Sequence, residues 1–503
     1  GEPPASCDSL FDRMQKAGVL TEEDIWQRFR LALVEGKLPL AKAILQRMPN
    51  ATKANLKLID SVYANPQRAL DKKSISLKSR LGRELNLYAL ERVSRSQMAV
   101  ALKHWGHMQA SYDAGDRSYL WSRFALYAAR QHDPAALEYY TRGSDATLDK
   151  EQIAWKVRAA LRIKDWPGVQ AAIGEMPVSQ QQESAWRYWK ARALKEQQQI
   201  PQANAIFVPL SHERSYYGLL AEEELGPVMS EPPSFYKASE ADIKEVAALP
   251  GIQRALELQR QELRWESRSE WAMATKDFDD RLMIAAAEIA ARQEWYDLAI
   301  ITADKTRFTH DYTLRYPTPY RDLVRSFSKD QGLDEAWVYG LARQESRFII
   351  QAKSGVGAAG LMQVMPATAR WIAKRMGLDS YHNGMIHQLE TNIQMGTYYM
   401  RHVLDQMGGQ ALMATAAYNA GPGRAKRWAD PQPMEGAIYA ETIPFSETRN
   451  YVQKVMANAY FYASRLGTKV QSVKQRLGVI AGTASDNVNP DDETVVAEQN
   501  KPE

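Results

Sequence analysis

Prolines recur at the spacing of a helical repeat in the first half of the chain. Pro134, Pro167 and Pro201 are separated by 33 and then 34 residues, which is the period of two-helix solenoid repeats related to the tetratricopeptide type. Each proline follows a short polar break and precedes an apolar segment, where a proline can open a returning helix. Pro39 occupies the same place in an earlier unit. The spacing predicts helix pairs that stack into a curved superhelix.

Tryptophans mark the helices that precede these prolines. Similar sequence segments begin at Trp121, Trp155 and Trp186. An earlier segment of the same kind begins at Trp26. Large apolar residues at a repeated position usually pack between the helices of a solenoid, because each repeat buries its apolar face against its neighbours. We therefore assign these tryptophans to the core rather than to a ligand site.

The length of the chain, 503 residues, predicts two or three domains, because a single core stops growing well below that size. Proline- and glycine-rich breaks near residues 226–234 and 315–320 divide it further. We predict a mainly all-α protein with a helical-repeat superhelical domain over residues 1–236, a small helical linker domain over 237–308 and an α-rich third domain over 309–470. Residues 471–503, which lack aromatic side chains, are expected to form a disordered tail.

Composition excludes several classes of site. The net charge of +4 is spread along the chain, whereas nucleic-acid binding normally requires a dense Lys/Arg patch. Cys7 is the single cysteine, so an intrachain disulfide and a multi-cysteine metal site are excluded. His382 and His387 have no third ligating residue nearby, and no EF-hand spacing is present. We expect no metal and no cofactor.

The sequence does not indicate whether the protein is exported from the cytoplasm. No apolar stretch reaches membrane-spanning length, and the run at residues 282–291 is interrupted by Glu288. The chain begins without a signal peptide, which suits either a cytosolic protein or a mature secreted one whose leader has been removed.

One carboxylic acid falls on the apolar face of a predicted helix. In residues 334–348, Trp337, Leu341 and Phe348 recur at helical spacing, and Glu345 lies between the last two. Burial disfavours the charged carboxylate, so the pKa of Glu345 should rise. A carboxylic acid that is still protonated near neutral pH can donate a proton to a glycosidic oxygen. The alternative is a structural acid, satisfied by a hydrogen bond or paired with an arginine.

Three later segments supply groups suited to a sugar. The glycine-rich residues 354–363 permit close backbone approach to a ligand, but they lack the Lys-Ser/Thr pair of a phosphate loop. Tyr418 and Asn419, at a helix end followed by Gly421, offer a phenol and an amide for sugar hydroxyls, or serve in capping and packing. In residues 441–451, Glu441 precedes a turn and is free to reach a substrate, whereas Glu447 is expected to be a helix-dipole partner.

Taken in order, these segments resemble the catalytic domain of soluble lytic murein transglycosylases, of the glycoside hydrolase family 23 type. The resemblance rests on residues 344–346 (QES), 354–363 (SGVGAAGLMQ), 417–421 (AYNAG) and 443–451 (IPFSETRNY). The helical-repeat domain (residues 1–236) and the linker domain (237–308) also resemble that family, so the resemblance covers nearly all of the chain except the tail. It implies a ring of helices with a lysozyme-like domain resting on it.

The resemblance also implies roles for individual residues. Glu345 would be the only catalytic acid and base, and the groove around it would be lined by Ser354, Met362, Gln363, Met365, Tyr418, Asn419, Glu441 and Tyr451. The substrate would be peptidoglycan glycan strands. The protein would be located in the periplasm, because peptidoglycan lies outside the inner membrane. The helical-repeat domain would be free to recruit other cell-wall enzymes.

A single acid leaves the reaction without a protein nucleophile. Retaining and inverting glycosidases both use a pair of carboxyl groups, and the sequence offers no obvious partner next to Glu345. The muramyl C6 hydroxyl would then attack C1, after Glu345 has protonated the glycosidic oxygen. The product would be a 1,6-anhydromuramyl end, formed without water.

Two other functions remain open at this point. A goose-type muramidase would use the same glutamate but admit water, giving ordinary reducing ends. A catalytically inactive, peptidoglycan-binding helical scaffold would bind the strands without releasing soluble fragments.

Overall fold

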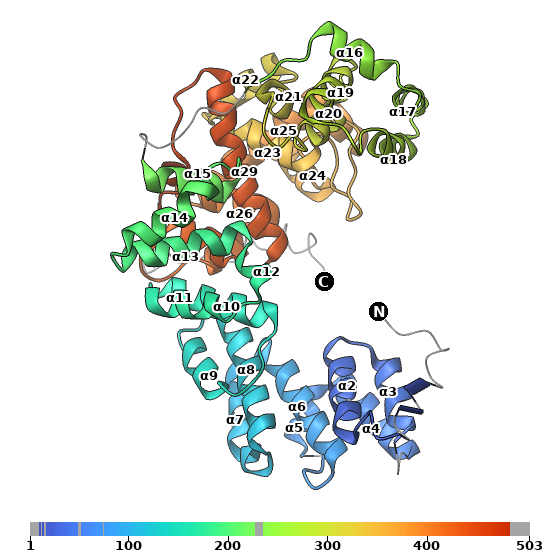
Figure 1. Cartoon of the computed structure of the whole chain (residues 1–503), viewed down its shortest axis with the longest axis vertical. Helices are drawn as coiled ribbons and strands as arrows, with labels where there is room; N and C mark the ends of the chain where they lie inside the picture. Colours follow the sequence, from blue (N-terminus) through green and yellow to red (C-terminus); the bar gives the residue numbers. More distant parts are fainter. Residues whose placement is uncertain are drawn as a thin grey trace. The chain divides into compact units, whose positions relative to one another are not determined.

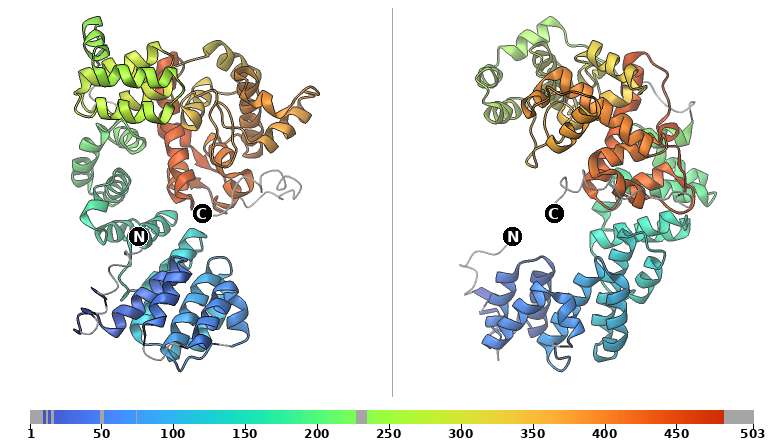
Figure 2. Two further views of the ribbon diagram at one scale, coloured as in Figure 1. Left: turned by 90° about the vertical axis from the view of Figure 1, so that its right-hand side faces the viewer. Right: turned by 180° about the vertical axis from the view of Figure 1, so that it is seen from behind.

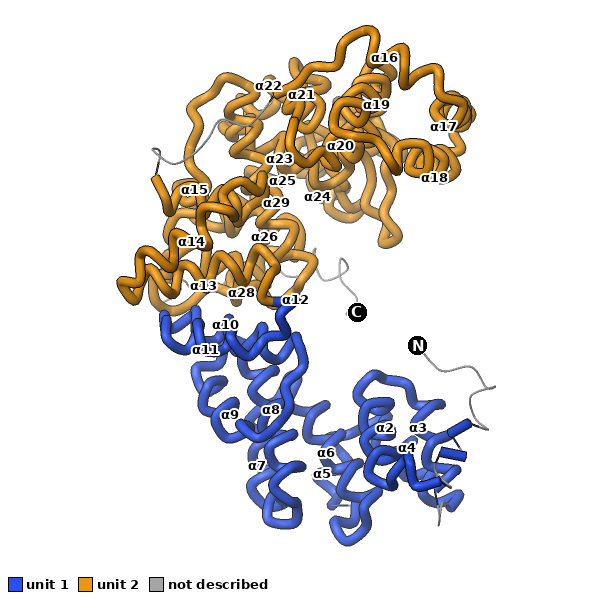
Figure 3. Tube along the Cα trace, in the orientation of Figure 1, with its two compact units in different colours: residues 1–180 blue, residues 181–503 orange. Residues whose placement is uncertain are grey.

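The computed structural model describes residues 10, 11, 13, 14, 17–48, 52–73, 75–226 and 235–482. The chain divides into two compact units, residues 1–180 and residues 181–503 (Figure 3). Cys7 and most of the predicted break at 226–234 lie outside the described residues. The division at 180 does not coincide with the predicted domain limits at 236, 308 and 470, which stay a prediction.

The first unit is built from helices that pack in successive pairs (Figure 1). Local sequence sets their ends: Thr21 and Asp24, for example, form a capping box that opens α2. The helices are α2 (Glu22–Val34), α3 (Leu38–Gln46), α4 (Lys53–Ala64), α5 (Pro66–Asp71), α6 (Arg80–Ser94), α7 (Met98–Met108), η2 (Gln109–Ser111), α8 (Ala114–Arg130), α9 (Ala136–Arg142), α10 (Lys150–Arg162) and α11 (Trp166–Gly174). A further short helix, α12 (Val178–Gln181), contains the division point.

The repeat residues take the positions expected of them. Trp26, Trp121, Trp155 and Trp186 are all buried, which confirms their assignment to the core. Proline lies in the first turn of α3 and α11, as it does in α14 (Ile200–Ser211) of the second unit. Pro134 differs, because it comes just before α9 rather than inside it.

The second unit begins with one more helix pair and continues into the linker and the third region. Its first helices are α13 (Ser184–Glu196), α14 and α15 (Tyr216–Leu225). The linker region contains α16 (Glu240–Ala247), α17 (Pro250–Arg260), α18 (Arg264–Ala274), α19 (Asp280–Arg292) and α20 (Tyr296–Ala303). The rest comprises α21 (Tyr312–Arg315), α22 (Arg321–Asp330), α23 (Glu335–Ser346), α24 (Pro366–Arg375), η3 (Asn383–His387), α25 (Leu389–Gln406), α26 (Ala411–Ala420), α27 (Pro422–Arg427), α28 (Gly436–Thr442), α29 (Ser446–Leu466) and α30 (Val473–Leu477).

Two helices form the centre of the third region, α23 and the long α29 (Figures 1 and 2). Gly340 allows them to approach closely, because a Cβ atom at that position would lie 3.0 Å from the backbone of Val455 and Ala459. Asn458 donates a hydrogen bond across the contact to the Gly340 carbonyl (3.3 Å). The catalytic candidates on α23 are therefore held against α29.

The predicted all-α class is confirmed, and the described strands are limited to one short pair. β1 (Met434–Glu435) and β2 (Val479–Ile480) are antiparallel, with Met434 opposite Ile480. This pair corrects the predicted tail, because residues 473–480 form α30 and β2 instead of lacking structure. Val473, Leu477 and Ile480 are buried, and this burial stabilises the segment despite its lack of aromatic residues. Residues 483–503 lie outside the described part of the chain.

Candidate active site

Glu345 is the last residue but one of α23. The helix is capped at its start by Asp334 and ends where Arg347 (φ 51°) and Phe348 (φ 68°) adopt left-handed backbone conformations. Such conformations are uncommon for residues other than glycine, and residues held in them cluster at functional sites. The left-handed pair stops the helix directly after Ser346, so Glu345 lies in the last turn of the helix rather than in mid-helix.

The catalytic helix is also anchored from the linker side. Arg343 pairs with Asp304 (2.9 Å) and donates to the Arg315 carbonyl (3.0 Å). The Arg343 side chain is only 10% exposed, whereas Asp304 is 43% exposed. A charge-assisted contact of this kind helps to hold α23 in position.

Glu345 is partly buried and has an unusual protonation equilibrium. Burial raises its pKa to about 8, and the negative charge of Glu447 raises it further, while a hydrogen bond from Tyr451 acts in the opposite direction. The Tyr451 hydroxyl donates to Glu345 Oε1 at 2.5 Å. The predicted rise in the pKa of Glu345 agrees with this environment, so the carboxyl group is mainly protonated at neutral pH.

Tyr418 and Asn419 lie at the end of α26. The Tyr418 hydroxyl donates to the Met362 carbonyl (2.8 Å), and burial together with the charge of Glu345 raises its pKa well above the ordinary value. The Asn419 Oδ1 accepts a hydrogen bond from Thr448 (2.7 Å). Glu345, Tyr418 and Tyr451 therefore converge from three helices, as the sequence motifs predicted.

Asn392, on α25, organises the glycine-rich loop and was missed by sequence reasoning. Its Oδ1 accepts from the Met362 N–H (2.7 Å), and its Nδ2 donates to the carbonyls of Ala359 (3.0 Å) and Ile386 (2.8 Å). Gly360 is required beside it, because φ is +79° there and a Cβ atom would lie 2.1 Å from Asn392 Nδ2. Met362 and Ala359 are 30 and 33 positions away from Asn392, so no local pattern marks its contact with the loop.

The other predicted loop residues have different surroundings. Ser354 Oγ accepts from the Ala358 N–H (2.9 Å), Gln363 has a left-handed backbone (φ 48°), and Met365 precedes α24 as its N-cap. The side chain of Met362 is fully buried, and Gly396 leaves room for it. The expected sugar contact of Met362 is therefore corrected, since only its carbonyl takes part, through Tyr418.

Glu441 lies outside this cluster and is corrected in the same way. It is 1% exposed, and its Oε2 accepts hydrogen bonds from Trp189 Nε1 (3.1 Å) on α13 and from the Tyr217 hydroxyl on α15. Gln453 Nε2 lies 3.5 Å from the same oxygen. A carboxylate enclosed by helices of the repeat region does not line a sugar groove, and the distant partners could not be foreseen from the local motif.

Glu447 has the helical position expected of it, but the motifs did not reveal that it lies near Glu345. It lies in the first turn of α29, four residues before Tyr451, so both side chains lie on the same face of that helix. Because Tyr451 contacts Glu345, the Glu447 carboxylate is also close enough to raise the pKa of Glu345. The spacing of four residues between Glu447 and Tyr451 was the sequence feature that could have revealed this proximity.

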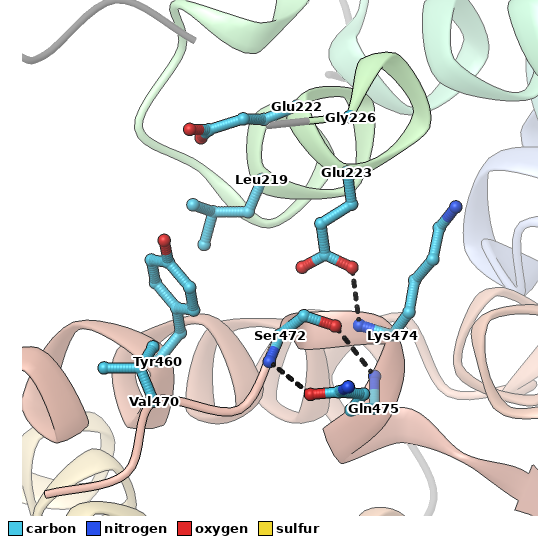
Figure 4. Close-up of a pocket in the computed structure, with 9 residues that line it drawn as sticks. All are labelled: Leu219, Glu222, Glu223, Gly226, Tyr460, Val470, Ser472, Lys474 and Gln475. Atoms are coloured by element: carbon cyan, nitrogen blue, oxygen red, sulfur yellow. Dashed lines mark hydrogen bonds between the residues drawn. The ribbon is translucent and has the colours of Figure 1, made fainter. Parts of the chain in front are cut away.

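A cavity of about 530 Å³ lies elsewhere, among α15, α29 and α30. Figure 4 shows that Glu223 and Lys474 meet across it, where Glu223 accepts the Lys474 backbone N–H (3.0 Å). None of the predicted site residues lines it. The volume alone therefore does not identify the reaction site.

The described residues, 10–482 apart from the gaps given above, contain neither a metal-binding cluster nor a membrane-spanning helix. Within them, no group of three or more His, Cys, Asp or Glu side chains could hold a metal ion. Likewise, no helix in the described part of the chain combines the length and apolar character needed to cross a bilayer.

Three family models match parts of the chain. The Transglycosylase SLT domain matches residues 322–438, the Soluble lytic transglycosylase helical domain matches residues 442–470, and the Soluble lytic murein transglycosylase L domain matches residues 245–308. The first two matches contain Glu345, Tyr418 and Tyr451.

Known relatives extend the similarity over most of the chain. The soluble lytic murein transglycosylase of Salmonella typhimurium is 28% identical over 476 residues, which are 93% of this chain and 73% of the relative. The X-ray structure of an inactive mutant of the lytic transglycosylase Slt from Pseudomonas aeruginosa aligns with a TM-score of 0.78 and 30% identity, covering 94% of this chain and 77% of that chain. The 70 kDa soluble lytic transglycosylase of Escherichia coli aligns with a TM-score of 0.70 and 26% identity, over 96% of this chain and 78% of that chain.

Proposed function

The chain belongs to the soluble lytic murein transglycosylase family, and from this premise we propose that it cleaves the β-1,4 bond between N-acetylmuramic acid and N-acetylglucosamine without water, using Glu345 as its single catalytic carboxyl group. As a member it is a peptidoglycan lytic transglycosylase. The observation that carries the proposal is the geometry of the Glu345 carboxyl group, which accepts a hydrogen bond from Tyr451 and whose pKa burial raises to about 8.

The hydrogen bond from Tyr451 orients the acid. Because the tyrosine hydroxyl donates to Oε1, the proton of the carboxyl group resides on Oε2. Within the described residues, Oε2 has no hydrogen-bond partner, so its proton is available to an incoming glycosidic oxygen. The hydrogen bond from Tyr451 also stabilises the Glu345 carboxylate that remains after proton transfer.

The second half of the reaction returns the proton. Cleavage leaves an oxocarbenium-like centre at C1 of the muramyl residue, which its acetamido group can stabilise. The Glu345 carboxylate then takes the proton of the C6 hydroxyl, whose oxygen bonds to C1 and closes the 1,6-anhydro ring. Atoms balance without a water molecule, and Glu345 regains its proton for the next cycle.

The sugar-binding residues follow from the same geometry. We propose Tyr418, Asn419, Gln363, Ser354 and Met365 as groove residues. Tyr418 is close enough to Glu345 for the carboxylate charge to raise its pKa, and Asn419 follows it on α26. The other three lie in or next to the glycine-rich loop, which Ser346, the neighbour of Glu345, contacts through the Leu361 carbonyl (2.7 Å). Met362 contributes through its carbonyl, which accepts the hydrogen bond from Tyr418. The periplasm is the corresponding location, because it is the compartment in which peptidoglycan is accessible.

The sugar ends formed from purified sacculi test the proposal. We expect mass spectrometry of the soluble products to show 1,6-anhydromuramyl ends, lighter by one water than reducing ends. Ordinary reducing ends would instead identify a hydrolytic muramidase. Tight binding without soluble fragments would favour the non-catalytic scaffold, although an intact Glu345–Tyr451 pair argues against that alternative.

Glu447 supplies the one specific reason to consider the hydrolytic alternative, because a second carboxylate near the acid can activate water. If Glu345 acts alone, Glu447→Gln should keep its maximal rate within a few-fold. Its only expected effect is on pH dependence. Removing the nearby negative charge lowers the pKa of Glu345, so the fall in activity that wild type shows as pH rises through about 8 should move to lower pH.

The control for this variant is Glu390→Gln, which changes another acid in the first turn of a helix, α25. We expect its pH profile to match wild type. A loss of about 10²-fold or more at every pH in Glu447→Gln, the size of a missing acid–base group, would contradict the single-carboxyl mechanism. Rates are measured as solubilisation of labelled sacculi between pH 5 and pH 9.

A further inference from the structure

A separate cavity of about 290 Å³ lies where α23 and α26 begin. This volume is at the small end of pockets that hold ligands. One part of its lining is apolar, and another is polar. The apolar part includes Leu333, Trp337, Leu404 and Met456, and the polar part is Asp334, Gln410, Gln471, Gln475 and Arg476.

The cavity is at the opposite end of two helices from the catalytic residues. α23 starts after Asp334, at the cavity, and reaches Glu345 eleven residues later, or about 16 Å away at 1.5 Å per residue. α26 starts at Ala411, which also lines the cavity, and ends beside Tyr418 and Asn419. None of the residues proposed for the groove lines this space.

Arg476 provides a buried positive charge. Its side chain is only 7% exposed, and Nη1 pairs with Asp334 Oδ2 at 2.6 Å. Its Nε–H is buried and has no hydrogen-bond partner among the described residues. Buried polar groups are nearly always satisfied, so a guanidinium group with spare donors at a cavity wall indicates an acceptor supplied from outside the chain.

The start of α26 provides a second, independent preference for negative charge. The helix has ten residues, and no side chain caps its N-terminus at Gln410. The first backbone N–H groups of a helix lack partners within it, and they favour an anion together with the helix dipole. Ala411, the first residue of the helix, lines the same cavity as Arg476.

Asp334 narrows the chemistry of the ligand. Its side chain is 41% exposed, so it can accept a hydrogen bond from an ammonium or amide N–H while Arg476 holds a carboxylate. Inorganic phosphate has no N–H or ammonium group, and the Asp334 carboxylate would repel its net negative charge. The apolar wall suits a small side chain, and the glutamine amides suit a peptide bond.

We propose that this cavity, formed by Asp334, Arg476 and the start of α26, binds an amino acid or short peptide through its free carboxylate. The carboxylate lies between the Arg476 guanidinium and the N–H groups of α26, and the ligand's own N–H or ammonium group donates to Asp334. The site is separate from the glycan groove and does not depend on the mechanism proposed for Glu345.

Calorimetric titration of the full chain tests this site. The probes are alanyl-alanine in its L,L and D,D forms, the same dipeptides with amidated C-termini, and inorganic phosphate. We expect at least one free dipeptide to bind saturably, and both its amide and phosphate to bind at least about tenfold more weakly, since a charge-assisted hydrogen bond is lost or unmatched. Glu345→Gln should bind the dipeptide as wild type does.

Variants assign the binding to Arg476. Arg476→Gln should weaken dipeptide binding at least about tenfold. The matched control is Arg401→Gln, which removes an exposed arginine paired with Asp405 outside the cavity and should leave binding unchanged. If Arg476→Gln fails to fold, Gln471→Glu replaces it, because Gln471 is exposed at the cavity and an added negative charge there should repel the carboxylate.

Four results would overturn the proposal. The first is the absence of saturable binding up to about 10 mM dipeptide, and the second is equal binding by wild type and by the cavity variants. The third is binding of phosphate or of the amidated dipeptide as tightly as the free dipeptide, and the fourth is loss of dipeptide binding in Glu345→Gln. The last result would place the dipeptide in the catalytic groove.

Discussion

Replacing Glu345 by glutamine should reduce the release of soluble fragments from murein by about 10²–10⁴-fold, the contribution of a positioned general acid and base. The amide oxygen can still accept the hydrogen bond from Tyr451, but the group has no proton to transfer. Solubilisation of labelled sacculi at pH 6 to pH 7 measures the effect. Full activity in this variant would remove Glu345 from its proposed role.

The same substitution should increase thermal stability, and the increase should depend on pH. In the unfolded chain Glu345 loses its proton near pH 4.3, whereas in the folded protein it keeps the proton until about pH 8. Between these values the folded wild type therefore loses stability as pH rises, by up to about 1.4 kcal/mol per pH unit. Glutamine does not titrate, so the difference in Tm should widen from pH 5 to pH 8.

Calorimetry at several pH values measures this difference, with Glu390→Gln as the control for loss of an exposed glutamate. The control should show no widening. A constant difference for Glu345→Gln across the same range would mean that the carboxyl group ionises normally in the folded protein. That outcome would contradict a proton held at neutral pH.

Replacing Asn392 by alanine should disrupt the glycine-rich loop and destabilise the second unit by about 3–5 kcal/mol. Three hydrogen bonds to buried backbone groups are lost, and each unsatisfied group costs about 1–3 kcal/mol. Because Met362 and Gln363 follow Gly360 in this loop, solubilisation of sacculi should fall as well. Calorimetric unfolding and the solubilisation assay measure the two effects.

Asn392→Asp gives a sharper version of this test. The aspartate can accept from the Met362 N–H but cannot donate to Ala359 or Ile386, so it should also be destabilised. Asn383→Ala, at an exposed position on η3, should lie within about 0.5 kcal/mol of wild type. Asn392→Ala with wild-type stability would show that the loop holds its conformation without this amide.

The position of Glu345 was predictable because its signal is local. Helical spacing places the acid among Leu341 and Phe348, and burial raises the pKa of a carboxyl group whatever its neighbours are. The repeat tryptophans were predictable for the same reason, since a fixed period describes which face of each helix is covered. Short motifs likewise brought Tyr418 and Tyr451 to the site, in agreement with the hydrogen bonds they form.

Glu441 and Met362 were misassigned because their surroundings come from distant parts of the chain. The oxygen of Glu441 is hydrogen-bonded by Trp189, 252 positions away, and no motif near Glu441 contains that information. Met362 is enclosed by α25. A motif can indicate which segments come together, but it does not state which of its members face the ligand.

The sequence by itself determined the helical class, the repeat spacing, the family and the acid, because each depends on local periodicity or on the order of short motifs. Only the tertiary structure decided the protonation partners of Glu345, the support of the glycine-rich loop by Asn392 and the structure of residues 473–480. Those features depend on which side chains meet after folding, and the burial of Val473 and Ile480 or the nearness of Glu447 to Glu345 exists only once separate helices have packed.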